Sequence, residues 1–318
     1  MKKLLCIVGP TATGKTDLAI SLATKTDGVL ISADAVQVFK KLNIISGKDL
    51  PDDTHFISGK GGFGHYAIGN ISIYLLDLVA PTQDFSVAEF STQASSIIQY
   101  ICSEKKLPIV VGGTGLYVKS LVDGIDTSDV PRDNLLRSRL QEYSTFKLQT
   151  LLQKKDKKKF DFMNNSDKNN PRRLVRAIEI AIFGEKRKEK KVDNYDVLFI
   201  GLLCDRDTLK KRIDARVEKR MEQGAVTEAK TLFKNYQNLS NQVKTANGYR
   251  QLFGYLLGEY SFGEAIEKWK ISEYLHAKNQ MTWFGKDKRI HWYNILDKEF
   301  HNKLEKEVLA WYNRKVKL

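Results

Sequence analysis

Cysteine is scarce in this 318-residue chain, and long apolar runs are missing. The three cysteines, Cys6, Cys102 and Cys204, lie far apart without metal-ligand spacing, which excludes a disulfide framework and favours a reduced, cytoplasmic setting. No apolar stretch approaches the ~20 residues of a membrane span. The first eight residues lead directly into a glycine turn, unlike a signal peptide. We therefore expect a cytoplasmic protein with no membrane partner.

Acidic residues are too few to balance the basic ones, and the formal net charge is +14. The excess is concentrated, because residues 147–191 contain fifteen Lys or Arg but only six Asp or Glu. A solvated surface could carry such charge, yet a concentrated basic segment favours a polyanionic partner, and nucleic acid is the better interpretation.

The octet Gly9-Pro10-Thr11-Ala12-Thr13-Gly14-Lys15-Thr16 is the most informative motif. It follows the apolar run Leu4 to Val8 and begins a helical pattern, as expected of a phosphate-binding loop. The glycines let backbone N–H groups surround an anion, Lys15 neutralises phosphate charge, and the Thr16 hydroxyl can hold Mg²⁺. The motif alone does not identify the phosphate compound, which could be a nucleotide or another diphosphate.

Two further segments follow strand-like runs in the same way. The first, residues 32–37, carries Asp34, which can act as a general base or a group near Mg²⁺, or can simply cap a helix. The second, residues 110–117, carries a glycine pair followed by Thr114, whose hydroxyl could reach a ligand, although such pairs often only make tight turns.

The order of elements predicts an α/β fold with a P-loop NTPase-like parallel sheet. The expected strands are Leu4–Val8, Val29–Ile31, Tyr74–Val79, Pro108–Val111 and Val197–Leu203. The pattern assigns residues 1–124 and 192–318 to the α/β core and residues 125–191 to a basic, mostly helical insertion. Everything after Asp205 reads as helical, with long helices over Asp207–Tyr236 and Ser261–Phe284. No long heptad pattern is present, so we expect a monomer.

Taken together, these motifs resemble the tRNA dimethylallyltransferases, also called tRNA isopentenyltransferases. The matching segments run in family order: GPTATGKT (9–16), ISADAVQVFKKLNI (31–44), DFSVAEF (84–90), VGGTGLYVKSLVDG (111–124), NPRRLVRAIEI (170–180), RVEKRMEQG (216–224), GYRQL (248–252) and AKNQMTWFGKDKRIHWYN (277–294). No Cys/His quartet follows Trp292, so the bacterial type is the better match.

The resemblance implies that the loop holds dimethylallyl diphosphate and that the acceptor is N6 of the adenosine just 3′ of the tRNA anticodon. Asp34 would then be the base, with Thr114 also catalytic. Residues Gly9 to Thr16 and Lys278 would bind the diphosphate, with Mg²⁺ at Thr16. The anticodon stem-loop would contact these residues: Asp34, Ala35, Val36, Gln37, Thr114, Arg137, Pro171, Arg172, Arg173, Leu174 and Arg176.

The chain departs from the family pattern on its last long helix, where Tyr274 and Asn279 replace two arginines and only Lys278 remains. A point charge grips phosphate less well than a bidentate guanidinium, so weaker substrate binding is expected.

Three other functions are compatible with parts of the sequence. A P-loop kinase or ATPase shares residues 9–16 but gives residues 32–37 no role. An adenylate isopentenyltransferase acting on free AMP would need no basic insertion. A non-catalytic RNA-binding protein would not need Lys15, Thr16, Asp34 and Thr114.

Overall fold

The computed structural model describes residues 2–51, 54–59, 63–124, 130, 133–183 and 194–314. The chain divides into two compact units. Met1–Val122 together with Asp193–Leu318 form one, called here the core unit, and Asp123–Val192 form the other, called the inserted unit.

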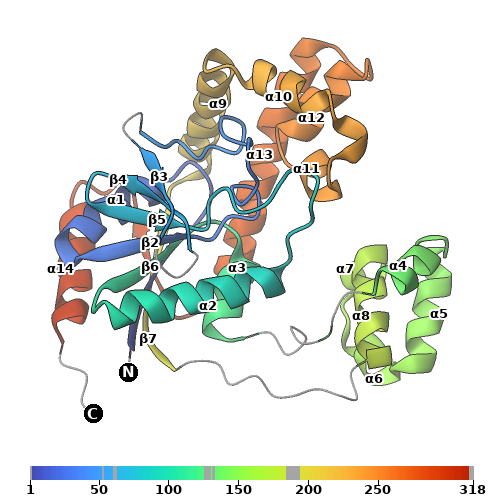
Figure 1. Ribbon diagram of the computed structural model, residues 1–318, viewed down its shortest axis with the longest axis horizontal. Coiled ribbons are helices and arrows are strands. Elements are labelled where there is room, and N and C mark those ends of the chain that lie inside the picture. Colours follow the sequence, from blue (N-terminus) through green and yellow to red (C-terminus); the bar gives the residue numbers. More distant parts are fainter. Residues whose placement is uncertain are drawn as a thin grey trace. The chain divides into compact units, whose positions relative to one another are not determined.

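An eight-stranded, mostly parallel sheet organises the core unit (Figure 1). Its strand order in the described residues is β3-β4-β5-β2-β6-β1-β7-β8, in which the pairs β3–β4 and β4–β5 are antiparallel and the others parallel. The strands are β1 (Lys2–Val8), β2 (Gly28–Ser32), β3 (His55–Ile57), β4 (His65–Ile68), β5 (Ile71–Tyr74), β6 (Leu107–Val111), β7 (Tyr195–Leu203) and β8 (Ile290–Asn294). The predicted fold class is confirmed.

Both faces of the sheet are buried, which explains the short apolar strands. Leu4 and Cys6 pack on one face, with residues of α2 (Val87–Ser103) and α3 (Gly115–Val122). Leu5 and Ile7 pack on the other, with α1 (Lys15–Thr26) and α14 (Phe300–Asn313). Successive strand residues point to opposite faces, so alternate side chains of β1 fill two separate cores.

Two predicted elements near the sheet were wrong. The strand expected at Tyr74–Val79 ends at Tyr74, because Leu75 and Asp77 adopt left-handed φ angles of 66° and 54° that interrupt an extended strand. The segment after Asp205 is not wholly helical, since β8 adds a parallel strand beside β7.

The helix predicted over Asp207–Tyr236 is also wrong, because it breaks at Gly224, where φ is 103°. Two helices result, α9 (Arg206–Glu222) and α10 (Ala225–Phe233), followed by the 3₁₀ turn η2 (Tyr236–Asn238), α11 (Asn241–Thr245) and α12 (Tyr249–Leu256). The last predicted helix is confirmed as α13 (Phe262–Phe284), with Ser261 and Glu264 forming a capping box.

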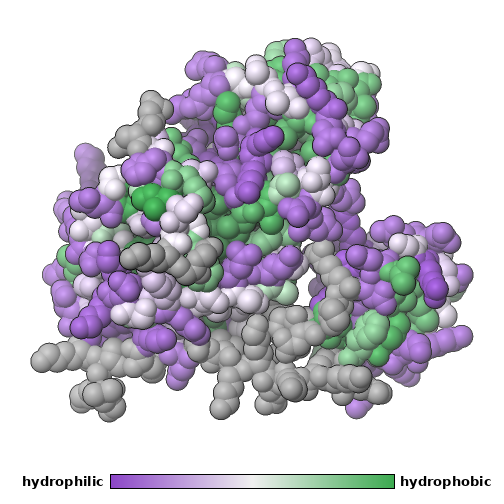
Figure 2. Space-filling view, viewed as in Figure 1, coloured by the Kyte–Doolittle hydropathy of each residue, from purple (hydrophilic) through white to green (hydrophobic). Residues whose placement is uncertain are grey.

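The described part of the inserted unit is helical, comprising α4 (Asn134–Gln141), α5 (Thr145–Lys155), α6 (Lys157–Phe162), α7 (Asn165–Lys168) and α8 (Pro171–Phe183). The side chains of Asp133, Ser144, Asp156 and Asn164 cap the first four. Leu148, Leu152, Leu174 and Ile178 belong to its own small core. Its visible surface is largely hydrophilic, with hydrophobic residues among the charges (Figure 2). The Lys-rich residues 186–191 lie outside the described residues.

Among the helices of the described ranges, none combines the length and hydropathy that crossing a bilayer requires.

Candidate functional site

The phosphate-binding loop joins β1 to α1, and its glycines are required by its backbone. Gly9 has a φ of 133°, and a Cβ there would lie 2.4 Å from the carbonyl oxygen of Leu202. Gly14 adopts a φ of 82° at the N-cap of α1. The buried Thr13 donates its hydroxyl hydrogen to the Pro10 carbonyl at 2.9 Å. The loop is therefore held in shape before any anion binds.

Lys15 reaches back into this loop, where its Nζ donates to the Pro10 carbonyl at 2.6 Å. Burial lowers the pKa of the Lys15 ammonium to about 7, although part of the side chain remains accessible. The positive charge of Arg216 lowers this pKa further, and the negative charge of Asp34 raises it. An anion in the loop would reverse this effect by favouring the charged ammonium. Thr16 follows in the same helical turn and is exposed.

The Asp34 side chain stabilises the turn that follows β2. Its Oδ1 accepts from the N–H groups of Val36 and Gln37 at 2.8 and 3.2 Å. The capping interpretation of this aspartate is therefore correct in part, although it caps a turn rather than a helix. Because the side chain is only half-buried and one oxygen holds the turn, the carboxylate is fixed in orientation yet remains accessible.

Thr114 joins this turn to the loop after β6. Its Oγ1 accepts from the Ala35 N–H at 3.0 Å, and its own N–H donates to the Ala33 carbonyl at 3.1 Å. Gly112 allows the approach, because a Cβ there would lie 2.3 Å from that same carbonyl oxygen. Thr114 therefore lies directly beside the Asp34 turn.

The three loops belong to β1, β2 and β6, which are neighbours in the sheet. All three strands run in parallel, so their carboxyl ends meet at one edge, where α/β proteins bind ligands. The structure thus brings together the phosphate loop, Asp34 and Thr114 as the sequence indicated.

Gln280 of α13 bridges two of these loops and was not predicted. Its Oε1 accepts from the Thr11 N–H at 2.8 Å, and its Nε2 donates to the Gly113 carbonyl at 3.1 Å. A Cβ on Gly113 would lie only 2.0 Å from this nitrogen. Gln280 therefore fixes the spacing between the phosphate loop and the Thr114 loop.

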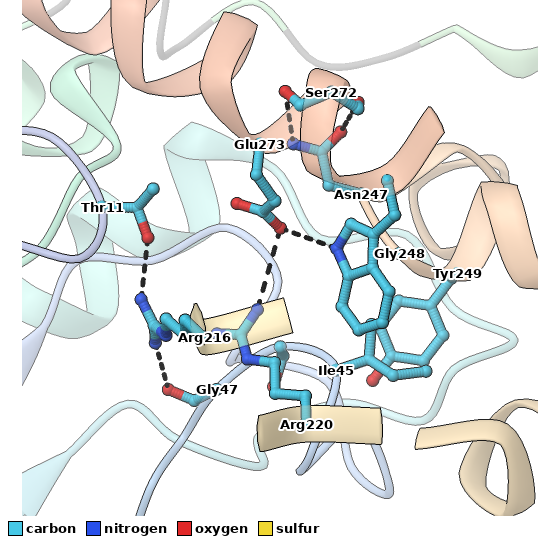
Figure 3. A network of polar contacts seen from close by, with 12 residues as sticks. Thr11, Ile45, Gly47, Arg216, Arg220, Asn247, Gly248, Tyr249, Ser272 and Glu273 are labelled. Atoms are coloured by element: carbon cyan, nitrogen blue, oxygen red, sulfur yellow. Dashed lines mark hydrogen bonds and ion pairs between the residues drawn. The ribbon is translucent and has the colours of Figure 1, made fainter. Parts of the chain in front are cut away.

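Two arginines of α9 also reach the phosphate loop. Arg212 Nε donates to the Ala12 carbonyl at 2.7 Å, and Arg216 Nη1 donates to the Thr11 hydroxyl at 2.8 Å. Figure 3 shows Arg216 lying between Thr11 and Gly47. Their spacing of four residues on one helix was a readable signal, but only the folded chain brings α9 to residues 11 and 12.

Helix α13 carries Tyr274 and Asn279 where the family pattern has two arginines, and these two side chains lie in different surroundings. Tyr274 packs into a small apolar cluster with Ala12 of the phosphate loop, and its hydroxyl accepts from Arg206 Nε at 3.0 Å. Asn279 is exposed. Lys278 is exposed as well, and no contact between its ammonium group and the phosphate loop is formed within the described residues. Diphosphate binding by Lys278 stays a prediction.

The arginines predicted to bind RNA occupy two environments in the inserted unit. Arg137 and Arg176 both hold the buried carboxylate of Glu179. Arg172 and Arg173 are exposed beside Pro171 at the start of α8, with Arg173 paired to Asp167. Leu174 has no exposed surface, so its side chain stabilises the unit's core instead of meeting a partner.

Comparisons with known proteins add independent information. A family model described as IPP transferase matches residues 37–287, and one described as isopentenyl transferase matches residues 2–57. The tRNA dimethylallyltransferase of Halothermothrix orenii is 35% identical over 92% of this chain and 87% of its own length. The tRNA dimethylallyltransferase of Anoxybacillus flavithermus is 35% identical over 99% of this chain and 97% of its own length.

Solved structures agree with these relatives. The tRNA isopentenylpyrophosphate transferase of Bacillus halodurans is 30% identical, covers 98% of this chain and 97% of its own, and has a TM-score of 0.69. A eukaryotic dimethylallyltransferase, described as acting on tRNA, has a TM-score of 0.78 at 25% identity, over 100% of this chain and 81% of its own.

Proposed function

Because this chain belongs to the IPP transferase family, we propose that its three-loop site joins a dimethylallyl group to N6 of the adenosine adjacent to the anticodon. The protein is an enzyme, a prenyltransferase that transfers a dimethylallyl group to tRNA. Its donor is dimethylallyl diphosphate. The observation that carries the proposal is the Ala35–Thr114 hydrogen bond, which sets the Asp34 turn beside the loops at the end of the sheet.

The diphosphate-binding groups fit an allylic leaving group. When the C–O bond breaks, negative charge grows on the departing diphosphate, and preorganised donors there lower the barrier. The backbone N–H groups of Ala12, Thr13 and Gly14, the Lys15 ammonium and the Arg216 guanidinium supply such donors. Arg216 adds a second positive charge beside the phosphate loop, at Thr11.

The acceptor side needs a group that holds N6 and receives its proton. As the new C–N bond forms, one N6 hydrogen becomes acidic and passes to the Asp34 carboxylate, while the leaving electron pair stays on the diphosphate. The turn formed by Asp34, Ala35, Val36 and Gln37 orients this carboxylate, and Thr114 fixes the turn.

Magnesium fits the phosphate loop through Thr16. Its hydroxyl is exposed at the start of α1 and makes no hydrogen bond to another group within the described ranges. The described residues contain no cluster of three or more Asp, Glu, His or Cys that could hold a metal. Mg²⁺ is commonly held by one or two protein groups together with substrate phosphates and water. When bound, it would add positive charge against the diphosphate.

The anticodon stem-loop requires cationic contacts, and the exposed Arg172 and Arg173 are suited to them. We also propose that the protein acts as a monomer in the cytoplasm.

The test is incubation of the protein and Mg²⁺ with radiolabelled dimethylallyl diphosphate and one of three acceptors: tRNA with an adenosine-rich anticodon loop, AMP, or none. Label in tRNA alone supports the proposal. Label in AMP would replace it by an adenylate isopentenyltransferase. No label transfer, together with ATP turnover in a parallel assay, would replace it by a nucleotide hydrolase.

A further inference from the structure

The Gln37 side chain is held at both ends. Its Oε1 accepts from the Ser32 hydroxyl at 3.1 Å, and its Nε2 donates to the Gly47 carbonyl at 2.9 Å. Its backbone N–H also donates to Asp34. Gln37 thus connects the end of β2 and the Asp34 turn to Gly47, ten residues further along.

The same Gly47 carbonyl lies near Arg216. Arg216 Nη2 is 3.4 Å from that oxygen and 2.9 Å from Asp49 Oδ2, while its Nη1 reaches the Thr11 hydroxyl of the phosphate loop (Figure 3). A carbonyl oxygen has two lone pairs and can accept from both side chains. One backbone oxygen therefore links the acceptor side of the site to its diphosphate side.

The turn that presents this oxygen is held firmly. Glu228 of α10 accepts from the N–H groups of Asn43, Ile44 and Ile45 at 2.8, 2.8 and 3.0 Å, and its carboxylate also accepts from the Tyr249 hydroxyl at 2.7 Å. Movement of Gly47 away from its two donors would disturb this arrangement.

Gly47 also has no room for a side chain. Its φ is 64°, and a Cβ there would lie 1.9 Å from Arg220 Nη2 and 2.4 Å from Arg216 Nη2. Arg220 is buried, with its Nη1 3.7 Å from Glu273 Oε1 (Figure 3). The two guanidinium groups thus pack against the glycine backbone, which sets where Arg216 lies.

We propose that Gln37 is a positioning residue: through the Gly47 carbonyl that it shares with Arg216, it aligns the Asp34 turn with the diphosphate-binding groups. The inference rests on the proposed function, because Asp34 and Arg216 act on different substrates there. Gln37 need not touch the diphosphate to affect how it is bound.

A double-mutant cycle tests this coupling. Gln37→Met keeps a side chain of similar length but cannot donate to Gly47, and Arg216→Lys removes the guanidinium that reaches both Thr11 and Gly47. Dissociation constants for Mg²⁺ and inorganic pyrophosphate are measured by calorimetry for the wild type, each single variant and the double variant. We expect Gln37→Met alone to weaken pyrophosphate binding about threefold. The double variant should bind pyrophosphate about threefold more tightly than the product of the two single effects predicts.

Arg212→Lys provides the matched control cycle, since Arg212 lies one turn earlier on α9 and contacts the phosphate loop but not Gly47. The factor by which Arg212→Lys raises the dissociation constant for pyrophosphate should simply multiply with the factor for Gln37→Met. Multiplicative effects in both cycles, or wild-type pyrophosphate binding by Gln37→Met, would overturn the proposal.

The kinetics of dimethylallyl transfer give a second readout. Gln37→Met should lower kcat and raise the KM for dimethylallyl diphosphate together, whereas a loss confined to the KM for tRNA would assign Gln37 to RNA contact alone. A wild-type protein that transfers no label to tRNA would refute the proposed function, while the pyrophosphate cycle would still report the coupling.

Discussion

The Arg137 guanidinium binds the fully buried Glu179 carboxylate through two nitrogens, with Nε and Nη2 at 2.5 and 2.6 Å from its oxygens. Arg176 Nη1 adds a third contact at 3.1 Å, and the Asp133 N–H a fourth at 3.2 Å. Burial alone would raise the pKa of Glu179, but these hydrogen bonds outweigh it and hold the pKa below its usual value. Two arginines predicted from the sequence to face RNA therefore stabilise the inserted unit.

Removal of Arg137 should destabilise that unit. Arg137→Ala leaves a buried carboxylate with fewer donors, and we expect a loss of about 2–3 kcal/mol of unfolding free energy. Chemical denaturation followed by circular dichroism measures it. Arg172→Ala, at an exposed position, should stay within about 0.5 kcal/mol of the wild type. Equal losses in the two variants would contradict the structural role of Arg137.

Charge reversal at Arg172 and Arg173 should weaken tRNA binding and make it less salt-dependent. For every phosphate that is no longer neutralised, the slope of log K against log salt should become shallower by about 0.7–0.9. Filter binding between low and moderate salt measures both effects. Lys298→Glu with Lys306→Glu makes the same change in net charge at two exposed positions of the core unit, one just before α14 and one within it. If both pairs weaken binding equally, only net charge matters.

Replacement of Asp34 should separate its two roles. Asp34→Asn keeps an oxygen that accepts from Val36 and Gln37 but loses the basic carboxylate, so transfer should fall by about 10²–10⁴-fold with the melting temperature unchanged. Asp34→Ala should lose transfer equally and also about 1 kcal/mol of capping stability. Single-turnover assays and thermal melts report these quantities. Near-normal turnover of either variant would remove Asp34 from the chemistry, and tRNA binding should stay within a few-fold in both.

Pyrophosphate binding should take up a proton above neutral pH. The pKa of Lys15 is about 7 in the free protein, and a bound anion raises it by favouring the ammonium. Between those two pKa values Lys15 is mostly neutral when free and charged when bound, so affinity should fall as pH rises above about 7. Calorimetry at pH 8 in buffers of different ionisation enthalpy should show an uptake by Lys15 of about 0.9 proton.

Lys15→Arg is the matched control for this measurement. Arginine keeps its charge at pH 8, so the variant should retain only the protons exchanged by pyrophosphate itself. Identical uptake by the wild type and by Lys15→Arg would exclude Lys15 as the titrating group.

The central strands and the three loops could be predicted because each carries a local signal. The runs at β1, β2, β6 and β7 are apolar and bounded by glycine or polar residues, and parallel strands buried on both faces require such runs. β8 was missed because Ile290–Asn294 is short and mixes His291 and Asn294 with its apolar residues, so only its pairing with β7 defines it. The break at Gly224 was missed because an isolated glycine is also tolerated inside a helix.

The residues around the three loops had only a weak local signal. Gln280 and Arg216 read as ordinary polar residues of surface helices, and they join the site only because α13 and α9 reach residues 11 and 113 across the folded chain. The sequence did not indicate that Arg137 and Arg176 share the buried Glu179, because Arg137 reaches it from α4 and Arg176 from within α8. RNA contact by these two arginines stays a prediction.

The pairing of β1 with β7 has a consequence for how the protein is made. Leu5 pairs with Leu198, and β7 in turn pairs with β8, so the sheet is not complete until residues near 290 have left the ribosome. The helices of the inserted unit emerge between these partners and pack mainly on one another. Helical units with local contacts form fast, whereas parallel strands distant in sequence pair slowly. During synthesis the inserted helical unit can therefore fold before the sheet is complete, while one edge of β1 stays unpaired until β7 emerges.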